Sequence, residues 1–142
     1  MREMRWNCFD PGKGCYRKLM PRLGMFDDCF PGKIGMSDVD GMVELGGRFL
    51  MLEFKSHGGR LLTAQRLAFQ RMTEGSIDPM KFTVIVVFGD PETMEVTTLQ
   101  VFSRGKGEEP EPCTLEELRS RIREWAMRAQ RARMRPSLRE DA

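Results

Sequence analysis

Two adjacent glycines, Gly46 and Gly47, separate two apolar segments and constrain the fold more than any other feature of the sequence. The segments cover residues 40–45 and 48–55. Two consecutive glycines between strand-like segments indicate a two-residue β-hairpin turn, because that turn requires positive φ angles at both positions. The sequence therefore predicts two antiparallel strands with a register set by the turn.

This register brings two carboxylates together at the open end of the hairpin. If Leu45 faces Arg48, each further step along the strands pairs the next two residues, and Asp40 faces Glu53. Directly opposed side chains have Cβ atoms about 4.5–5.5 Å apart, and like charges at that distance are destabilising. Two such carboxylates need a shared proton or a cation. The hairpin therefore predicts a cation-binding site.

Lys55 lies two residues beyond Glu53 and is expected on the same face of the strand, whereas Phe54 points to the opposite face. Carboxylate oxygens at such a site suit Mg²⁺ or Mn²⁺. The alternative is a surface hairpin in which Glu53 and Lys55 form a salt bridge exposed to solvent. That alternative leaves Asp40 opposite Glu53 unexplained, so we favour the metal site.

The remaining segments predict a single α/β domain with a mixed sheet and the element order β-β-α-β-β-α. Residues 1–36 are rich in glycine and proline and should be irregular, apart from a short helix around residues 15–20. A Thr-x-x-Glu capping box at Thr114 predicts the start of the last helix. The expected elements after the hairpin are a helix over 62–74, a strand buried on both faces over 81–88, a strand over 94–102, a loop over 105–112, an amphipathic helix over 113–135 and a tail over 136–142.

Helical spacing places Leu62, Gln65, Ala68, Phe69 and Met72 on one arc, which we expect to face the sheet. A buried amide requires hydrogen-bond partners. Gln65 is therefore a candidate member of the site, and the alternative is a glutamine bonded to nearby backbone.

The segment from Ser37 to Ser56, with Asp40 thirteen positions before Glu53-Phe54-Lys55, resembles the PD-(D/E)XK nuclease superfamily. It is particularly similar to archaeal-type Holliday-junction resolvases and small phage nucleases of the VRR-NUC kind. The resemblance implies a restriction-endonuclease-like fold, a mixed central β-sheet flanked by helices. Its α-β-β-β-α-β core would cover about residues 15–102, with the catalytic core in 37–102.

By this resemblance, Asp40 and Glu53 would be metal ligands and Lys55 would position or activate the attacking water. Gln65 would lie near the scissile phosphate. The family's proline before the aspartate is absent here, so Asp38 is a second-shell candidate and a rival ligand, although the register faces it to Lys55. The family's glutamate on the first helix has no good counterpart in this sequence.

The charges of the chain suggest a polyanionic partner more by their distribution than by the net value of +2. Arginine binds phosphate bidentately without reading sequence. The alternative is an amphipathic helix whose basic outer face is solvated, and Trp125 could contribute to a homodimer. The candidate DNA-binding residues are Lys33, Arg60, Arg119, Arg123 and Arg128.

The four cysteines have irregular spacing, and reduced thiols are the first expectation. A zinc or iron–sulfur site on Cys8, Cys15 and Cys29 has little support from that spacing. His57 is expected to be an exposed loop residue. With no bilayer-length apolar run and no secretion signal, we expect an intracellular, cytoplasmic protein without membrane contact, and the resemblance is compatible with a phage-encoded one.

These observations favour a Mg²⁺-dependent DNA endonuclease that acts on branched or otherwise structured DNA, because no sequence-reading module is recognisable. A RecB-like exonuclease of the same fold, in which cysteines hold a cluster, is the second hypothesis. A non-catalytic nucleic-acid-binding protein is the third.

Overall fold

The computed structural model describes residues 23–37, 39–56 and 58–133. The chain divides into two compact units, Met1–Asp38 and Val39–Ala142. In the first unit, a 3₁₀ helix η4 (Leu23–Cys29) forms where the sequence predicted irregular chain. It has no buried residues, so the sequence lacks an apolar pattern that would predict this helix. The helix predicted around residues 15–20 lies outside the described residues.

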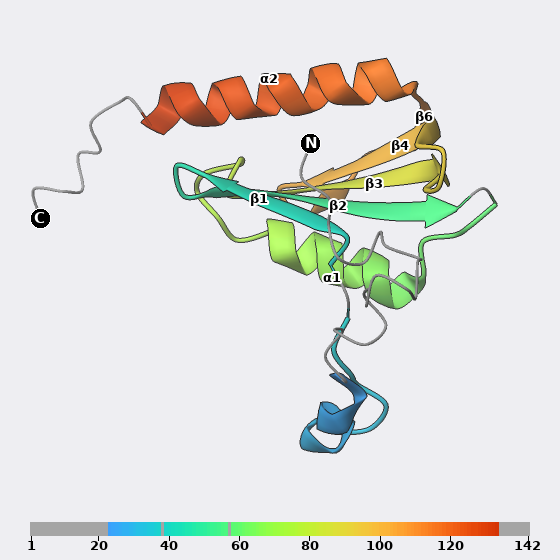
Figure 1. The fold of residues 1–142 in the computed structure, drawn as a ribbon. Coiled ribbons are helices and arrows are strands. Elements are labelled where there is room, and N and C mark those ends of the chain that lie inside the picture. The colour runs from blue at the N-terminus through green and yellow to red at the C-terminus, as the bar shows by residue number, and fades with distance from the viewer. Residues whose placement is uncertain (1–22, 38, 57, 134–142) are drawn as a thin grey trace, which may run out of the picture. The chain divides into compact units, whose positions relative to one another are not determined.

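The second unit is an α/β structure with a mixed open sheet, which confirms the predicted class. The strand order is β1-β2-β3-β4-β5, with β6 also paired to β4 (Figure 1). Only the β2–β3 pair is parallel among these strands. The elements are β1 (Gly41–Leu45), β2 (Arg48–Ser56), α1 (Thr63–Thr73), β3 (Phe82–Asp90), β4 (Glu95–Ser103), β5 (Lys106–Gly107), β6 (Glu111–Pro112) and α2 (Leu115–Arg133).

The hairpin has the predicted turn and register. Gly46 and Gly47 have φ angles of 63° and 82°, and Leu45 pairs with Arg48. The ladder continues in the same register until Gly41 pairs with Leu52. β1 is one residue shorter than predicted, so Asp40 lies just outside the paired strand.

Strands β5 and β6 occupy the segment predicted as a loop, and that prediction is wrong for these residues. Each strand is two residues long and pairs with β4. Two residues are too few to show a strand's alternation of polar and apolar side chains. Their pairing depends on β4, which lies beside them only in the folded chain.

The sheet is covered by one helix on each face. On one face, α1 contributes Phe69 to a core cluster with Met51 and Val84; on the other, α2 contributes Trp125 to a cluster with Leu50. Figure 1 shows the sheet between the two helices. Residues Val84 to Val87 are all buried, as predicted for a strand covered on both faces.

The predicted inward arc of α1 is only partly correct. Leu62, Ala68 and Met72 are exposed, whereas Phe69 and Thr73 are buried. The buried stripe follows Gln65, Phe69 and Thr73 and is rotated from the predicted arc. An apolar pattern misses Thr73, whose hydroxyl can be buried because it donates to the carbonyl oxygen of Phe69 at 2.9 Å.

Helix α2 begins at the predicted capping box. The Thr114 N–H donates to Glu117 Oε2, and the Glu117 N–H donates to Thr114 Oγ1, both at 3.2 Å. Its buried stripe includes Leu118, Trp125 and Ala129, as expected for an amphipathic helix. The part of the helix predicted beyond Arg133 lies outside the described residues. Across the described residues, every helix is too short or too polar to span a lipid bilayer.

Candidate active site

Glu53 and Lys55 lie near the carboxyl end of β2, on the face of the sheet that α1 covers. Met51, two residues earlier, belongs to the α1-side cluster, whereas Phe54 packs against the α2-side cluster. Side chains alternate along a strand, so Glu53 and Lys55 share the α1 face as predicted. The Glu53 and Lys55 side chains are 13% and 20% exposed. Both charges are thus largely shielded yet still reachable from solvent.

One oxygen of Glu53 receives two side-chain donors. Lys55 Nζ lies 3.4 Å from Glu53 Oε1, and Gln65 Nε2 donates to the same oxygen at 3.4 Å. The strand and the following helix thus bring together three of the four predicted site residues. Both distances are at the long end for charge-assisted contacts, so these donors hold the carboxylate loosely.

Gln65 combines the two roles that the sequence left open. Its side-chain oxygen accepts the backbone N–H of Leu62 at 3.3 Å, at the first turn of α1. The amide nitrogen is therefore directed to Glu53, because the oxygen end is engaged by a backbone donor. The hydrogen bond from the Leu62 N–H therefore orients the Gln65 amide group that contacts Glu53.

Asp40 approaches the site from the end of β1 in a manner that the register did not predict. Its Oδ2 accepts the backbone N–H of Phe54 at 2.7 Å. In the ladder that N–H would meet a main-chain carbonyl of β1, but the pairing ends at Gly41. The side chain of Asp40 takes the place of the missing acceptor. The expected ladder pair between Asp40 and Glu53 is thus replaced by a contact to the residue beside Glu53.

The donor set of Asp40 and Glu53 fits Mg²⁺ or Mn²⁺ in chemistry and number. Both supply hard carboxylate oxygens, and Mg²⁺ is usually bound by one or two carboxylates together with waters and substrate phosphates. A carboxylate has about four acceptor positions, so the bond from Phe54 leaves Asp40 able to bind a cation. In the described ranges, no group of three or more Asp, Glu, His and Cys residues is placed to hold a metal.

A hollow lies on the neighbouring strands β3 and β4, next to Glu53 and Lys55. Val86 pairs with Glu53, Phe88 pairs with Lys55, and Thr98 lies on the far side of Phe88. The hollow, of about 320 Å³, extends over Phe88 and Thr98, and its other walls include Gly58 and Pro110. Sequence reasoning missed this hollow. Its walls come from two loops and two strands that are distant in sequence, and no local pattern links them.

The loop that follows β2 turns tightly beside Lys55. The Gly59 N–H donates to the Ser56 carbonyl oxygen at 2.8 Å. A Cβ at position 59 would lie 2.8 Å from that oxygen and 3.4 Å from the Cβ of Lys55. A side chain at position 59 would therefore push against the end of β2 beside Lys55.

Three of the five predicted DNA-binding residues lie on the face of the sheet opposite this site. Arg119, Arg123 and Arg128 belong to α2, which covers the opposite face of the sheet. Arg119 and Arg128 also form ion pairs within the helix, with acids three and four residues earlier. Arg60 is exposed on the loop between Lys55 and α1, and Lys33 belongs to the first unit. Arg60 is thus the candidate whose segment adjoins the site.

Several predicted residues lie outside the described ranges, including Asp38, His57, Cys8 and Cys15. Of the cysteines that the structure describes, Cys29 is exposed and Cys113 is buried, and both are free thiols. Burial, and after it the negative charge of Glu117, raises the pKa of the Cys113 thiol. Cys113 belongs to the core under α2, which is a structural position.

Comparisons of the chain with protein-family models, with curated proteins and with solved structures gave no match.

Proposed function

We propose that this protein is a Mg²⁺-dependent DNA endonuclease of the PD-(D/E)XK type that hydrolyses phosphodiester bonds in branched or otherwise structured DNA. The observation that carries the proposal is the convergence of Lys55 and Gln65 on one oxygen of Glu53. Asp40 directly precedes β1 and accepts the backbone N–H of Phe54, the residue beside Glu53. Asp40, Glu53 and Lys55 match the residues of the motif, and the superfamily often carries a glutamine at the position of Gln65.

The arrangement of the elements supports the proposal. The superfamily core has the order α-β-β-β-α-β, and its last four elements match β1, β2, α1 and β3 in type and order. In this chain, α1 connects the parallel strands β2 and β3. The acidic residue and the lysine lie on the strand that leads into this crossover, on the face that α1 covers.

Each residue has a role that follows from its contacts. Asp40 and Glu53 would hold the metal, which when bound would stabilise charge on the phosphate and lower the pKa of a bound water. Lys55 places a positive charge beside Glu53, where it can orient the attacking water or stabilise developing negative charge. Gln65 holds the Glu53 carboxylate by one donor and is itself held by the backbone at Leu62.

The deciding experiment is a cleavage assay on duplex, flap, single-stranded and four-way-junction DNA, with Mg²⁺ and with EDTA. We expect Glu53→Gln and Lys55→Met to lower the cleavage rate by about 100-fold or more, because each removes a group that acts on the transition state. Glu92→Gln and Lys106→Met change exposed residues that are not among the proposed site residues, and they serve as matched controls. Circular dichroism should show that all four variants fold.

The outcomes separate the candidate functions. Cleavage that is unchanged in EDTA would contradict the metal mechanism. Cleavage that is lost on end-blocked DNA would identify an exonuclease of the same fold. The bond between Asp40 and the Phe54 backbone favours one rival, a nucleic-acid-binding protein in which these side chains are structural. Binding of DNA without turnover in Mg²⁺ or Mn²⁺ would support that rival.

A further inference from the structure

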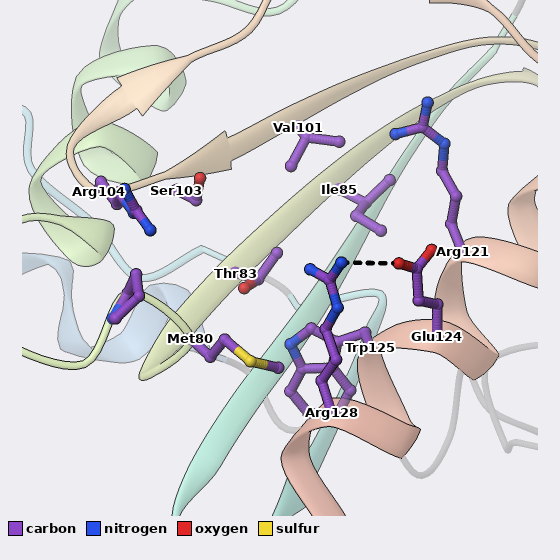
Figure 2. A pocket seen from close by; sticks show the side chains of 11 residues that line it. Met80, Thr83, Ile85, Val101, Ser103, Arg104, Arg121, Glu124, Trp125 and Arg128 are labelled. Carbon is purple, nitrogen blue, oxygen red and sulfur yellow. Dashed lines mark ion pairs between the residues drawn. The ribbon is translucent and has the colours of Figure 1, made fainter. Parts of the chain in front are cut away.

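A second and larger hollow lies between α2 and the sheet, on the face opposite Glu53 (Figure 2). It has a volume of about 500 Å³. Its walls come from the first residues of β3, the last residues of β4, the chain before β3, and α2. We call it the α2 pocket and define it by Met80, Thr83, Ile85, Arg104, Trp125 and Arg128.

The polar groups around the α2 pocket are mostly hydrogen-bond donors. The side chains of Arg104, Arg121 and Arg128 line it, and Glu124 is the one carboxylate among its lining residues. The Arg121 guanidinium is paired with Glu111, so Arg104 and Arg128 are the two guanidinium groups that matter for a ligand. Glu124 is already engaged by Arg128, at 2.8 Å. Such exposed ion pairs contribute little, so Arg128 can turn to a better acceptor. The pocket as a whole therefore favours a negatively charged ligand.

Arg104 is the guanidinium most available for a ligand. Within the part of the chain that the structure describes, no carboxylate lies within ion-pair distance of it. Figure 2 shows Arg104 and Arg128 on opposite sides of the hollow, with Thr83 between them. An anion held here would meet donors from two sides.

Trp125 supplies an independent sign of an absent acceptor. Its side chain lines the pocket and is 8% exposed, and its indole Nε1 has no acceptor among the described residues. Figure 2 shows this nitrogen on the edge of the ring nearest Met80 and Thr83. Buried donors are nearly always paired in folded proteins. A ligand oxygen in the pocket would satisfy this one.

The inner wall of the pocket is apolar, since Ile85 and Val101 come from the centre of the sheet and Met80 covers one side. A ligand that fits must therefore combine an apolar body with an anionic group. A volume of about 500 Å³ lies within the range of small-molecule sites, about 300–1,000 Å³. A phosphate monoester has nearly two negative charges at neutral pH, which suits two guanidinium groups better than a carboxylate does.

We propose that the α2 pocket binds a small organic phosphate of about the size of a mononucleotide. The phosphate lies between Arg104 and Arg128, and the apolar body lies against Ile85 and Val101 beside Trp125. This site is separate from the candidate nuclease site, because the two lie on opposite faces of the sheet.

The test uses the full chain with Trp6→Phe, so that Trp125 is the remaining tryptophan. AMP, adenosine and inorganic phosphate are titrated while Trp125 fluorescence is recorded, and calorimetry on the wild-type chain gives a second measurement. We expect a saturable response to AMP, with adenosine and inorganic phosphate each at least about ten-fold weaker. Binding of adenosine as tight as that of AMP would overturn the proposal, as would no AMP binding by both methods.

Variants locate the site. Arg104→Gly removes the guanidinium and suits the φ of 55° at this position, and it should weaken AMP binding about ten-fold or more. Arg123→Ala is the matched control, because Arg123 is an exposed residue of α2 outside the pocket lining. Glu53→Gln should leave AMP binding unchanged. An equal loss in Arg104→Gly and Arg123→Ala would refute the assignment of the pocket.

Discussion

The proposed binding of Mg²⁺ to Asp40 and Glu53 should stabilise the fold measurably, and this effect can be tested without any nucleic-acid substrate. Two carboxylates in an open site suggest a dissociation constant on the order of 1 mM. A ligand that binds only the native state adds RT ln(1 + [L]/Kd), which is about 1.4 kcal/mol at roughly 10 mM Mg²⁺. For a chain of this size each kcal/mol raises Tm by about 3 °C. The expected shift is therefore about 4 °C.

The position of Lys55 predicts a second, opposite effect. Its ammonium lies 3.4 Å from Glu53 Oε1 and competes with a cation for that carboxylate. Both side chains retain some solvent contact, so the competition should amount to about 1 kcal/mol rather than the larger value for a fully buried pair. Lys55→Met should therefore bind Mg²⁺ about five-fold more tightly and show a larger Tm shift, while it loses cleavage.

Thermal unfolding followed by circular dichroism measures these shifts, with KCl used to match ionic strength in the metal-free samples. Glu53→Gln removes a ligand and should lose the Mg²⁺-dependent shift. Glu92→Gln changes an exposed residue outside the proposed ligand set and should keep the shift. The same shift in wild type and Glu53→Gln would refute the assigned ligand, and the absence of any shift in wild type at saturating Mn²⁺ would refute the metal site.

Further predictions concern the fold and the thiols. Gly89→Ala would place a Cβ 1.9 Å from a carbonyl oxygen of the neighbouring strand and should cost about 3 kcal/mol or more in urea unfolding. A Cβ added at Gly75 has no atom within 4 Å, so Gly75→Ala should cost only about 1 kcal/mol, from the φ of 78°. Equal losses of unfolding free energy in Gly89→Ala and Gly75→Ala would contradict the packing argument. Thr114→Ala should cost about 1 kcal/mol through loss of the helix cap, and an unchanged urea midpoint would show that the cap is dispensable. Burial and its raised pKa leave Cys113 little thiolate at pH 8. Peptide mass spectrometry should therefore find Cys29 alkylated before Cys113, and Cys113 alkylated only as the pH rises further. Alkylation of Cys113 as early as that of Cys29 would contradict its burial.

Local sequence was sufficient for features that depend on neighbouring residues. Gly46 and Gly47 determine the turn, and the turn determines the register from Leu45–Arg48 to Gly41–Leu52. Strand alternation then places Glu53 and Lys55 on one face. The capping box at Thr114 and the continuous apolar run of β3 are equally local signals, and each appears where it was predicted.

Other features depended on contacts between distant residues. β5 and β6 exist because β4 offers an unpaired edge, and the hollow at Phe88 requires the loop at Pro110 to reach β4. The rotation of α1 depends on packing against the sheet, which buries Thr73 in place of Met72. No periodic pattern within one helix contains that information.

The sequence by itself determined that Glu53 and Lys55 share a face, because strand alternation is a property of the backbone. Helical spacing predicted an inward Gln65, but its contact with Glu53 depends on how α1 packs against the sheet. Only the tertiary structure decided that Asp40 bonds to the Phe54 backbone, since the hairpin ladder ends one residue before it. It also decided that the arginines of α2 lie on the face opposite Glu53. Which face a helix covers depends on how the chain crosses the sheet, and the residues of that helix alone do not encode it.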